Sequence, residues 1–138
     1  MKQYLKLCKM LLFLVSITIV ILSCGDKKIK KPFATYTVDA VTNKEYEITG
    51  ANLIKSENPT LTLKRGETYE FIVKAYGHPF YIKTEKTSGK VNTFDKGVIN
   101  NGANETILMF SIPKDAPDLL YYVCQYHKMM SGEIKIID

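Results

Sequence analysis

Residues 121–132 read YYVCQYHKMMSG, and this stretch decides how the rest of the chain is interpreted. Cys124 lies three residues before His127, and His127 lies three residues before Met130. An apolar-rich run precedes the stretch and a second run, Glu133 to Ile137, follows it, so the pattern predicts a loop between two β-strands. A thiolate, an imidazole and a thioether on one short loop are ligands that suit copper.

The chain has only two histidines, and the second, His78, directly precedes Pro79 and the predicted strand Phe80–Thr84. Two imidazoles and a thiolate in a plane, with a long axial thioether, make up a blue-copper ligand set. If the strand after His78 lies beside the strand that ends at Cys124, one cavity serves all four side chains. Taken singly, they also fit a turn histidine, a buried cysteine and a core methionine, so it is their joint order that favours a metal.

Short runs of β-branched and aromatic residues, separated by turn signals, predict an all-β Greek-key β-sandwich of about eight strands. The predicted strands are Thr35–Val41, Glu45–Thr49, Thr60–Leu63, Thr68–Ala75, Phe80–Thr84, Glu105–Ile112, Leu119–Cys124 and Gly132–Ile137. Residues 50–58 are predicted to be irregular, residues 64–67 a hairpin turn and residues 85–93 a loop. Alternation selects ten core residues: Leu61, Leu63, Phe71, Val73, Ile82, Leu108, Phe110, Val123, Ile134 and Ile136.

The N-terminus has the pattern of a signal peptide, because basic residues up to Lys9 precede the apolar run Met10–Leu22. That run is too short for a typical transmembrane helix. It ends in Leu22-Ser23-Cys24-Gly25, which resembles a bacterial lipoprotein box and implies lipidation of Cys24. We therefore expect a signal peptide over 1–23, a tether over 24–34 and one domain over 35–138. The mature protein is expected at the bacterial cell envelope, anchored in a lipid membrane on the periplasmic side or in the outer membrane.

Composition and cysteine count narrow the function further. The net charge of +5 falls to +2 without the three lysines of the predicted signal peptide, and the basic residues are scattered, so no nucleic-acid partner is expected. Of the three cysteines, only Cys124 keeps a free thiol once Cys8 is cleaved away and Cys24 is lipidated. A lone thiol in an oxidising compartment is protected when it binds a metal. Asn104-Glu105-Thr106 fits a glycosylation sequon, which we interpret as chance.

The pattern Tyr-x-Cys-x-x-His-x-x-Met-x-Gly after a distant Gly-His resembles the cupredoxin family of type 1 copper proteins, over residues 36–138. The spacing within the loop is similar to that of amicyanin. The resemblance implies one copper ion that cycles between Cu(I) and Cu(II), held by His78, Cys124, His127 and Met130. It also implies an electron carrier, not an enzyme, with larger redox proteins docking near His127.

Two neighbours of His78 are expected to influence the metal from the second shell. Gly77 corresponds to the glycine whose carbonyl lies near the metal in azurin. Pro79 departs from the family, since many cupredoxins have asparagine there, with a backbone N–H that donates to the cysteine sulfur. Proline has no N–H, which is expected to leave more charge on the thiolate and to favour Cu(II). Met129 is a rival to Met130 as axial ligand.

Three other interpretations stay open. The same ligands suit a copper(I) carrier or chaperone, which serves delivery or tolerance and has to release its metal readily. A metal-free interaction module of the same fold would tolerate loss of Cys124 or His78. A copper domain of a larger oxidase fits the short chain less well. Zinc suits the site less than copper does, because structural zinc prefers cysteine and histidine without a thioether.

Overall fold

The computed structural model describes residues 31–138, which form ten β-strands and no helix. The strands are β1 (Ala34–Asp39), β2 (Glu47–Gly50), β3 (Leu53–Glu57), β4 (Leu61–Lys64), β5 (Thr68–Lys74), β6 (Phe80–Lys83), β7 (Val98–Ile99), β8 (Ile107–Ser111), β9 (Leu119–Cys124) and β10 (Ser131–Ile137). Within this part of the chain no helix is long and apolar enough to cross a membrane. The predicted signal peptide, Cys24 and the tether up to residue 30 lie outside the described residues.

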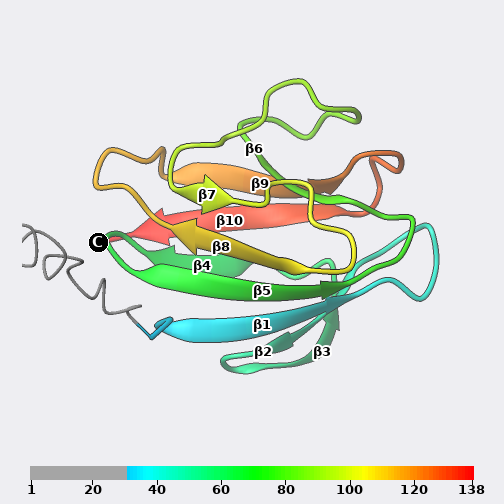
Figure 1. Cartoon of the computed structure of the whole chain (residues 1–138), viewed down its shortest axis with the longest axis horizontal. Helices are drawn as coiled ribbons and strands as arrows, with labels where there is room; N and C mark the ends of the chain where they lie inside the picture. Colours follow the sequence, from blue (N-terminus) through cyan, green and yellow to red (C-terminus); the bar gives the residue numbers. More distant parts are fainter. Residues whose placement is uncertain (1–30) are drawn as a thin grey trace, which may run out of the picture. The chain divides into compact units, whose positions relative to one another are not determined.

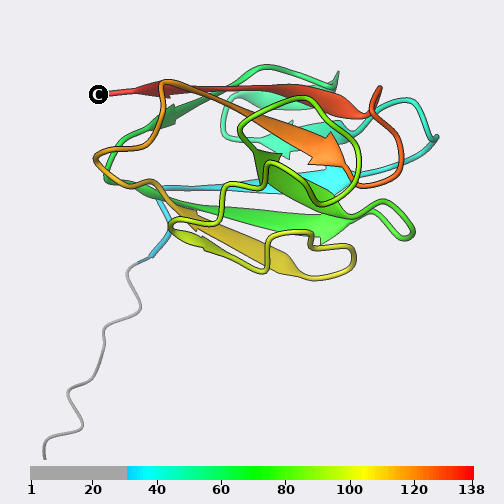
Figure 2. The same ribbon diagram turned by 90° about the horizontal axis from the view of Figure 1, so that it is seen from above.

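The strands form two sheets that pack face to face (Figure 1, Figure 2). One sheet has six strands in the order β3-β2-β1-β5-β8-β7, and the other has four in the order β4-β10-β9-β6. Most neighbours are antiparallel, but β1 pairs with β5 and β4 pairs with β10 in parallel. The predicted all-β sandwich is confirmed.

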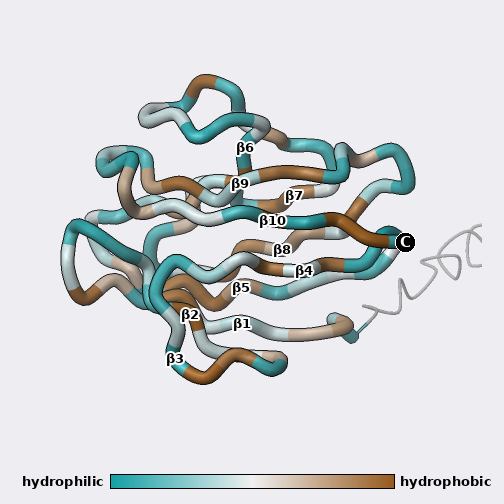
Figure 3. The backbone as a smooth tube through the Cα atoms, turned by 180° about the vertical axis from the view of Figure 1, so that it is seen from behind, coloured by the Kyte–Doolittle hydropathy of each residue, from teal (hydrophilic) through white to brown (hydrophobic). Residues whose placement is uncertain are grey.

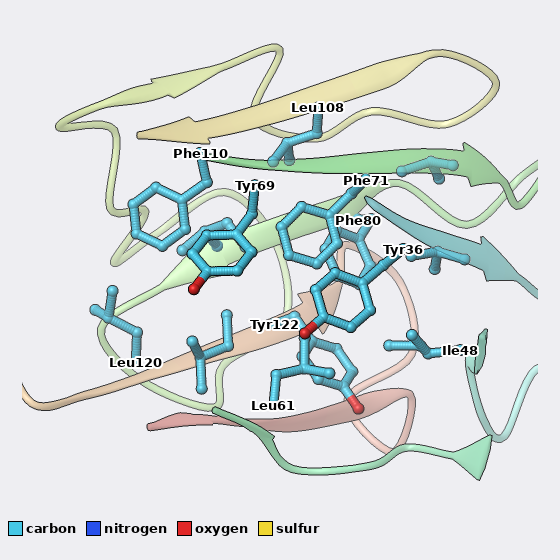
Figure 4. Packing of buried hydrophobic residues seen from close by; sticks show 14 of the residues in the cluster. Tyr36, Ile48, Leu61, Tyr69, Phe71, Phe80, Leu108, Phe110, Leu120 and Tyr122 are labelled. Atoms are coloured by element: carbon cyan, nitrogen blue, oxygen red, sulfur yellow. The ribbon is translucent and has the colours of Figure 1, made fainter. Parts of the chain in front are cut away.

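The core forms because alternate side chains of each strand point into the space between the sheets. All ten residues that alternation selects are buried. Aromatic rings fill the middle of this core (Figure 4): Phe80 stacks on Tyr122 with ring centroids 5.2 Å apart and meets the edge of Tyr46 at 5.1 Å. Phe71 continues the cluster, 5.7 Å from Phe80. Such contacts add to the stabilisation that comes from the buried area itself.

Two strands were missed by the sequence prediction. Residues 50–58 were expected to be irregular, but they contain β3, which pairs with β2 at the edge of the larger sheet. Its residues LIKSE do not alternate, and Ile54 is 90% exposed, so there was no period-two signal to detect. β7 is only two residues long and pairs with β8. These additions raise the number of strands from about eight to ten.

The prediction of a hairpin turn over residues 64–67 was wrong. The residues do turn, and Gly66 has a φ of 75°, in the region that favours glycine. However, β4 belongs to the four-stranded sheet and β5 to the six-stranded one, so the turn carries the chain from one sheet to the other. Arg65, within this turn, forms ion pairs with Asp118 and Asp138. A turn signal alone does not tell which partner the next strand will choose.

The connection after β6, residues 84–97, is mostly hydrophilic (Figure 3), and Gly89 within it donates its backbone N–H to the carbonyl of Gln125, directly after β9, at 2.7 Å. Lys83 is fully buried and donates to the carbonyls of Thr87 at 2.5 Å and Gly89 at 2.9 Å. Val123 is buried but does not belong to the central cluster, whereas its neighbours Tyr122 and Cys124 do. Val123 was predicted to lie between the sheets. It is buried, but by alternation it lies on the opposite face of β9 from Tyr122 and Cys124.

Candidate metal centre

The predicted ligands lie at one end of the sandwich: His78 in the connection 75–79 between β5 and β6, Cys124 at the end of β9, and His127 and Met130 in the connection 125–130 between β9 and β10 (Figure 1). β6 and β9 are antiparallel neighbours, with Phe80 opposite Cys124. The backbone N–H of Gln125 donates to the carbonyl of Pro79 at 3.1 Å, which continues this pairing into the two loops. The register therefore brings His78 to the side of the sheet where the loop after Cys124 begins.

Three of the four predicted ligands lie close together: His78, Cys124 and His127. The sulfur of Cys124 is 3.8 Å from Nδ1 of His78 and 3.7 Å from Nδ1 of His127, and the two Nδ1 atoms are 3.1 Å apart. A point about 2.1 Å from all three atoms lies in their plane, close to the roughly 2.0–2.3 Å of zinc bonds to imidazole and thiolate. Both imidazoles thus present the same nitrogen to one position, and the donor set fits a trigonal copper ion.

Burial separates the two candidate axial methionines. Met130 is fully buried and belongs to the central cluster with Cys124, whereas Met129 is 76% exposed. The loop that carries them is closed by backbone hydrogen bonds, from Met130 to the carbonyl of His127 at 3.0 Å and from Cys124 to the carbonyl of Met130 at 2.9 Å. Burial therefore favours Met130, and its role as a ligand stays a prediction.

The surroundings of His78 favour its neutral form. Burial lowers the pKa of its imidazole, and the nearby imidazole of His127 lowers that pKa further. A neutral imidazole leaves one ring nitrogen free as an acceptor, which is the form that binds a metal. The cluster contains no carboxylate among the described residues. The environment of His78 thus favours the form of its imidazole that can bind a metal.

The two neighbours of His78 lie in and after a tight turn: Gly77 is part of the turn and Pro79 follows it. Gly77 is exposed with a φ of 76°, and His78 donates its backbone N–H to the carbonyl of Ala75 at 2.9 Å. Pro79 is half-buried, and its carbonyl receives the N–H of Gln125. Pro79 is thus attached to the Cys124 loop through its carbonyl, and it has no N–H to offer the sulfur.

Three polar residues beside the site were not found by sequence reasoning: Tyr46, Asn58 and Asn104. The hydroxyl of Tyr46 donates to the carbonyl of His78 at 2.8 Å, and Asn104 Oδ1 accepts the N–H of His78 at 3.1 Å. Burial raises the pKa of Tyr46, and the adjacent Cys124 raises it further. In the sequence, Tyr46 lies 32 residues from His78 and Asn104 lies 26 residues from it, too far apart for any local pattern to link them.

The glycine that ends the motif has a packing reason. A Cβ at Gly132 would lie 2.2 Å from the hydroxyl oxygen of Tyr122, which donates to the carbonyl of Pro59 at 2.7 Å. A side chain there would displace that buried ring, so the position needs glycine because of space.

No protein-family model matches the sequence, and no curated protein matches it. Among solved structures, rusticyanin from Thiobacillus ferrooxidans is 24% identical with a TM-score of 0.50, covering 75% of this chain and 76% of that chain. A methionine-to-leucine variant of rusticyanin is 21% identical with a TM-score of 0.52 and the same coverage. Another rusticyanin structure, described as a copper protein, is 22% identical with a TM-score of 0.51, again over 75% and 76% of the two chains. At these identities the comparison shows that the fold is shared.

Proposed function

We propose that this chain, which has the cupredoxin fold, binds one copper ion and carries single electrons. The observation that supports this most is the triangle of donor atoms from His78, Cys124 and His127, whose common centre lies at metal-bonding distance from each. Thiolate and imidazole, with the buried Met130 on the same loop, are the combination that copper favours among the common metals. Bound copper supplies a one-electron couple between Cu(I) and Cu(II).

The protein contributes by fixing the positions of the metal-binding atoms and by limiting their contact with water. Cys124 and Met130 are fully buried, and the two imidazoles are half-buried, so little water reaches the donor atoms. His78 comes from the connection before β6, Cys124 from the end of β9, and His127 and Met130 from the connection after β9. The pairing of β6 with β9 links these segments. A site fixed in this way changes little when the charge of the metal changes, which suits electron transfer.

The surface beside His127 is the proposed docking site for a larger redox protein. Tyr126 is 61% exposed and Met129 is 76% exposed, so two large apolar side chains flank the half-buried His127. Exposed apolar residues that lie together are typical of a protein contact site. An electron would enter and leave through the edge of the His127 imidazole.

The proposed anchor is the lipidated Cys24, which holds the domain at a bacterial cell envelope. The described domain begins at the end of the sandwich where the C-terminus lies, opposite the end that carries the two ligand connections (Figure 2). The proposed docking surface beside His127 thus lies at the other end of the domain from its first described residues.

Voltammetry of the copper-loaded protein, combined with a chelator challenge, tests this function. An electron carrier is expected to show one reversible one-electron wave over repeated cycles and to keep its copper when a Cu(I) chelator is added. Rapid loss of Cu(I) to the chelator favours a copper carrier instead. Failure to bind either oxidation state rules out both and leaves a metal-free module.

Replacing Met130 with leucine is expected to weaken Cu(I) binding about tenfold, or about 1.4 kcal/mol, because a soft thioether donor is lost. Leucine keeps the volume, so packing changes little. The exposed neighbour provides the control: Met129→Leu is expected to leave the affinity within about twofold of the native value. Competition with a Cu(I) chelator measures both. A larger effect of the Met129 substitution would make Met129 the axial ligand.

A further inference from the structure

The backbone of His78 is held from both sides by side chains that are not ligands. Its N–H is shared between the carbonyl of Ala75 at 2.9 Å and Oδ1 of Asn104 at 3.1 Å. Its carbonyl accepts the hydroxyl of Tyr46 at 2.8 Å. Both polar groups of this peptide segment therefore have directed partners, which limits how far the residue can rotate or shift.

Tyr46 is itself firmly placed. It is fully buried, its ring meets the edge of Phe80 at 5.1 Å, and it meets Tyr122 at 6.2 Å. A hydroxyl on a ring packed in this way has few alternative positions. The hydroxyl gives the carbonyl of the half-buried His78 a hydrogen-bond partner, and loss of such a partner has a cost in stability.

Asn58 connects Tyr46 to the second ligand loop. Its Oδ1 accepts the N–H of Tyr46 at 2.9 Å, and its own N–H donates to the carbonyl of Tyr46 at 2.8 Å. Its Nδ2 donates to the carbonyl of Met129 at 3.1 Å, in the loop that carries His127 and Met130. Asn58 has a φ of 42°, a conformation that asparagine tolerates better than most residues.

We propose that Tyr46 and Asn58 form a brace that sets the distance between the two ligand-bearing connections. The path runs from the carbonyl of His78 through the side chain and backbone of Tyr46 to Asn58, and from there to the carbonyl of Met129. Tyr46 is thus a positioning residue for the metal and not a ligand. This inference rests on the copper binding proposed above.

The sequence around His78 explains why this residue needs support from another part of the chain. The Cys124–Met130 loop is closed by its own backbone hydrogen bonds, whereas His78 sits on a separate turn between a glycine and a proline. Pro79 has no N–H, so the residue after His78 cannot donate a hydrogen bond across to the other loop. The Tyr46 hydroxyl provides a link of this kind from a third segment of the chain, between β1 and β2.

The chain offers a matched pair of variants. Tyr46 and Tyr122 are both fully buried, and each donates its hydroxyl to a backbone carbonyl, that of His78 or that of Pro59. Tyr46→Phe and Tyr122→Phe each remove one buried hydrogen bond and keep the ring. We therefore expect the two substitutions to lower the stability of the fold by a similar amount. Only Tyr46→Phe removes a contact with a ligand residue, so only that variant is expected to change the metal site.

The first measurement is the rate of copper loss to a chelator, recorded with the visible spectrum of the copper-loaded protein. Tyr46→Phe is expected to release copper about tenfold faster and to shift the visible bands, because the hydrogen bond from Tyr46 to the carbonyl of His78 is lost. Tyr122→Phe is expected to stay within about twofold of the native rate, with an unchanged spectrum. Equal rates and spectra for the two variants overturn the brace.

The second measurement uses the protein without metal, so that the brace and the copper function can fail separately. Hydrogen exchange of the His78 amide, followed by NMR, is expected to be about tenfold faster in Tyr46→Phe than in Tyr122→Phe. Exchange that is equally fast in both variants contradicts the brace, whether or not copper binds. A native protein that binds no copper but shows the difference in exchange contradicts the proposed function and keeps the brace.

Discussion

Cys124→Ser is expected to lower the affinity for Cu(I) by a hundredfold to a thousandfold. Structural zinc sites gain about 10–16 kcal/mol from their ligands together, so the loss of one strong ligand of four costs about 3–4 kcal/mol. Serine is close to cysteine in size but offers a hydroxyl in place of the soft thiolate, so the fold has little reason to change. Chelator competition measures the affinity, and circular dichroism checks the fold.

Lys128→Ala is the control within the same loop, because Lys128 is exposed and lies between His127 and Met129. It is expected to change the affinity by less than about twofold. If Cys124→Ser binds Cu(I) as tightly as the native protein does, the thiolate is no ligand and the proposed site is wrong.

Phe80→Ala is expected to lower the free energy of unfolding by about 3–5 kcal/mol, the usual cost of truncating a buried phenylalanine. The ring is fully buried, stacks on Tyr122 and contacts Tyr46 and Phe71. It also lies opposite Cys124 in the sheet, so its loss loosens the strand pair that carries the site. Urea unfolding of the metal-free protein measures the effect.

Phe33→Ala is the matched control, since the same side chain is 62% exposed there and meets only the edge of one ring, Tyr69. Its expected cost is about 1 kcal/mol or less. Equal losses for the two substitutions would mean that the aromatic cluster between the sheets is not the main source of stability.

The core was predictable because alternation is a local signal. Every residue that was selected proved to be buried, and all of them except Val123 belong to the central cluster, since each strand shows one side to the other sheet. Val123 is the exception: it is buried but lies outside the central cluster to which its neighbours Tyr122 and Cys124 belong. All four residues of β6 are buried, and no alternation within that strand reports which of them face the other sheet. The burial of Lys83 was equally hidden.

The pairing of strands was harder to predict from the sequence. β3 has no alternation to detect, and the turn at Gly66 joins two sheets where its sequence suggested a hairpin. Both errors arise because the choice of partner strand depends on contacts far along the chain. The parallel pairing of β1 with β5, across more than thirty residues, is of this kind.

For the candidate site, too, one part could be predicted from the sequence and another part could not. Three of the proposed ligands lie within seven residues, and the fourth was suggested because only two histidines exist, so the sequence contained the donor set. Whether His78 reaches the other donors depends on the register of β6 and β9, which only the fold determines. Tyr46, Asn58 and Asn104 act through hydrogen bonds to backbone atoms, which leave no trace in a ligand motif.

The measurement that tests the central claim most directly is the visible absorption of the purified protein as Cu(II) is added, with the free thiol of Cys124 followed in parallel. We expect an intense thiolate-to-copper band that grows to one equivalent and then stops, while the reactive thiol disappears in the same proportion. A spectrum without that band, with Cys124 still reactive after one equivalent of Cu(II), would contradict a type 1 copper site in this protein.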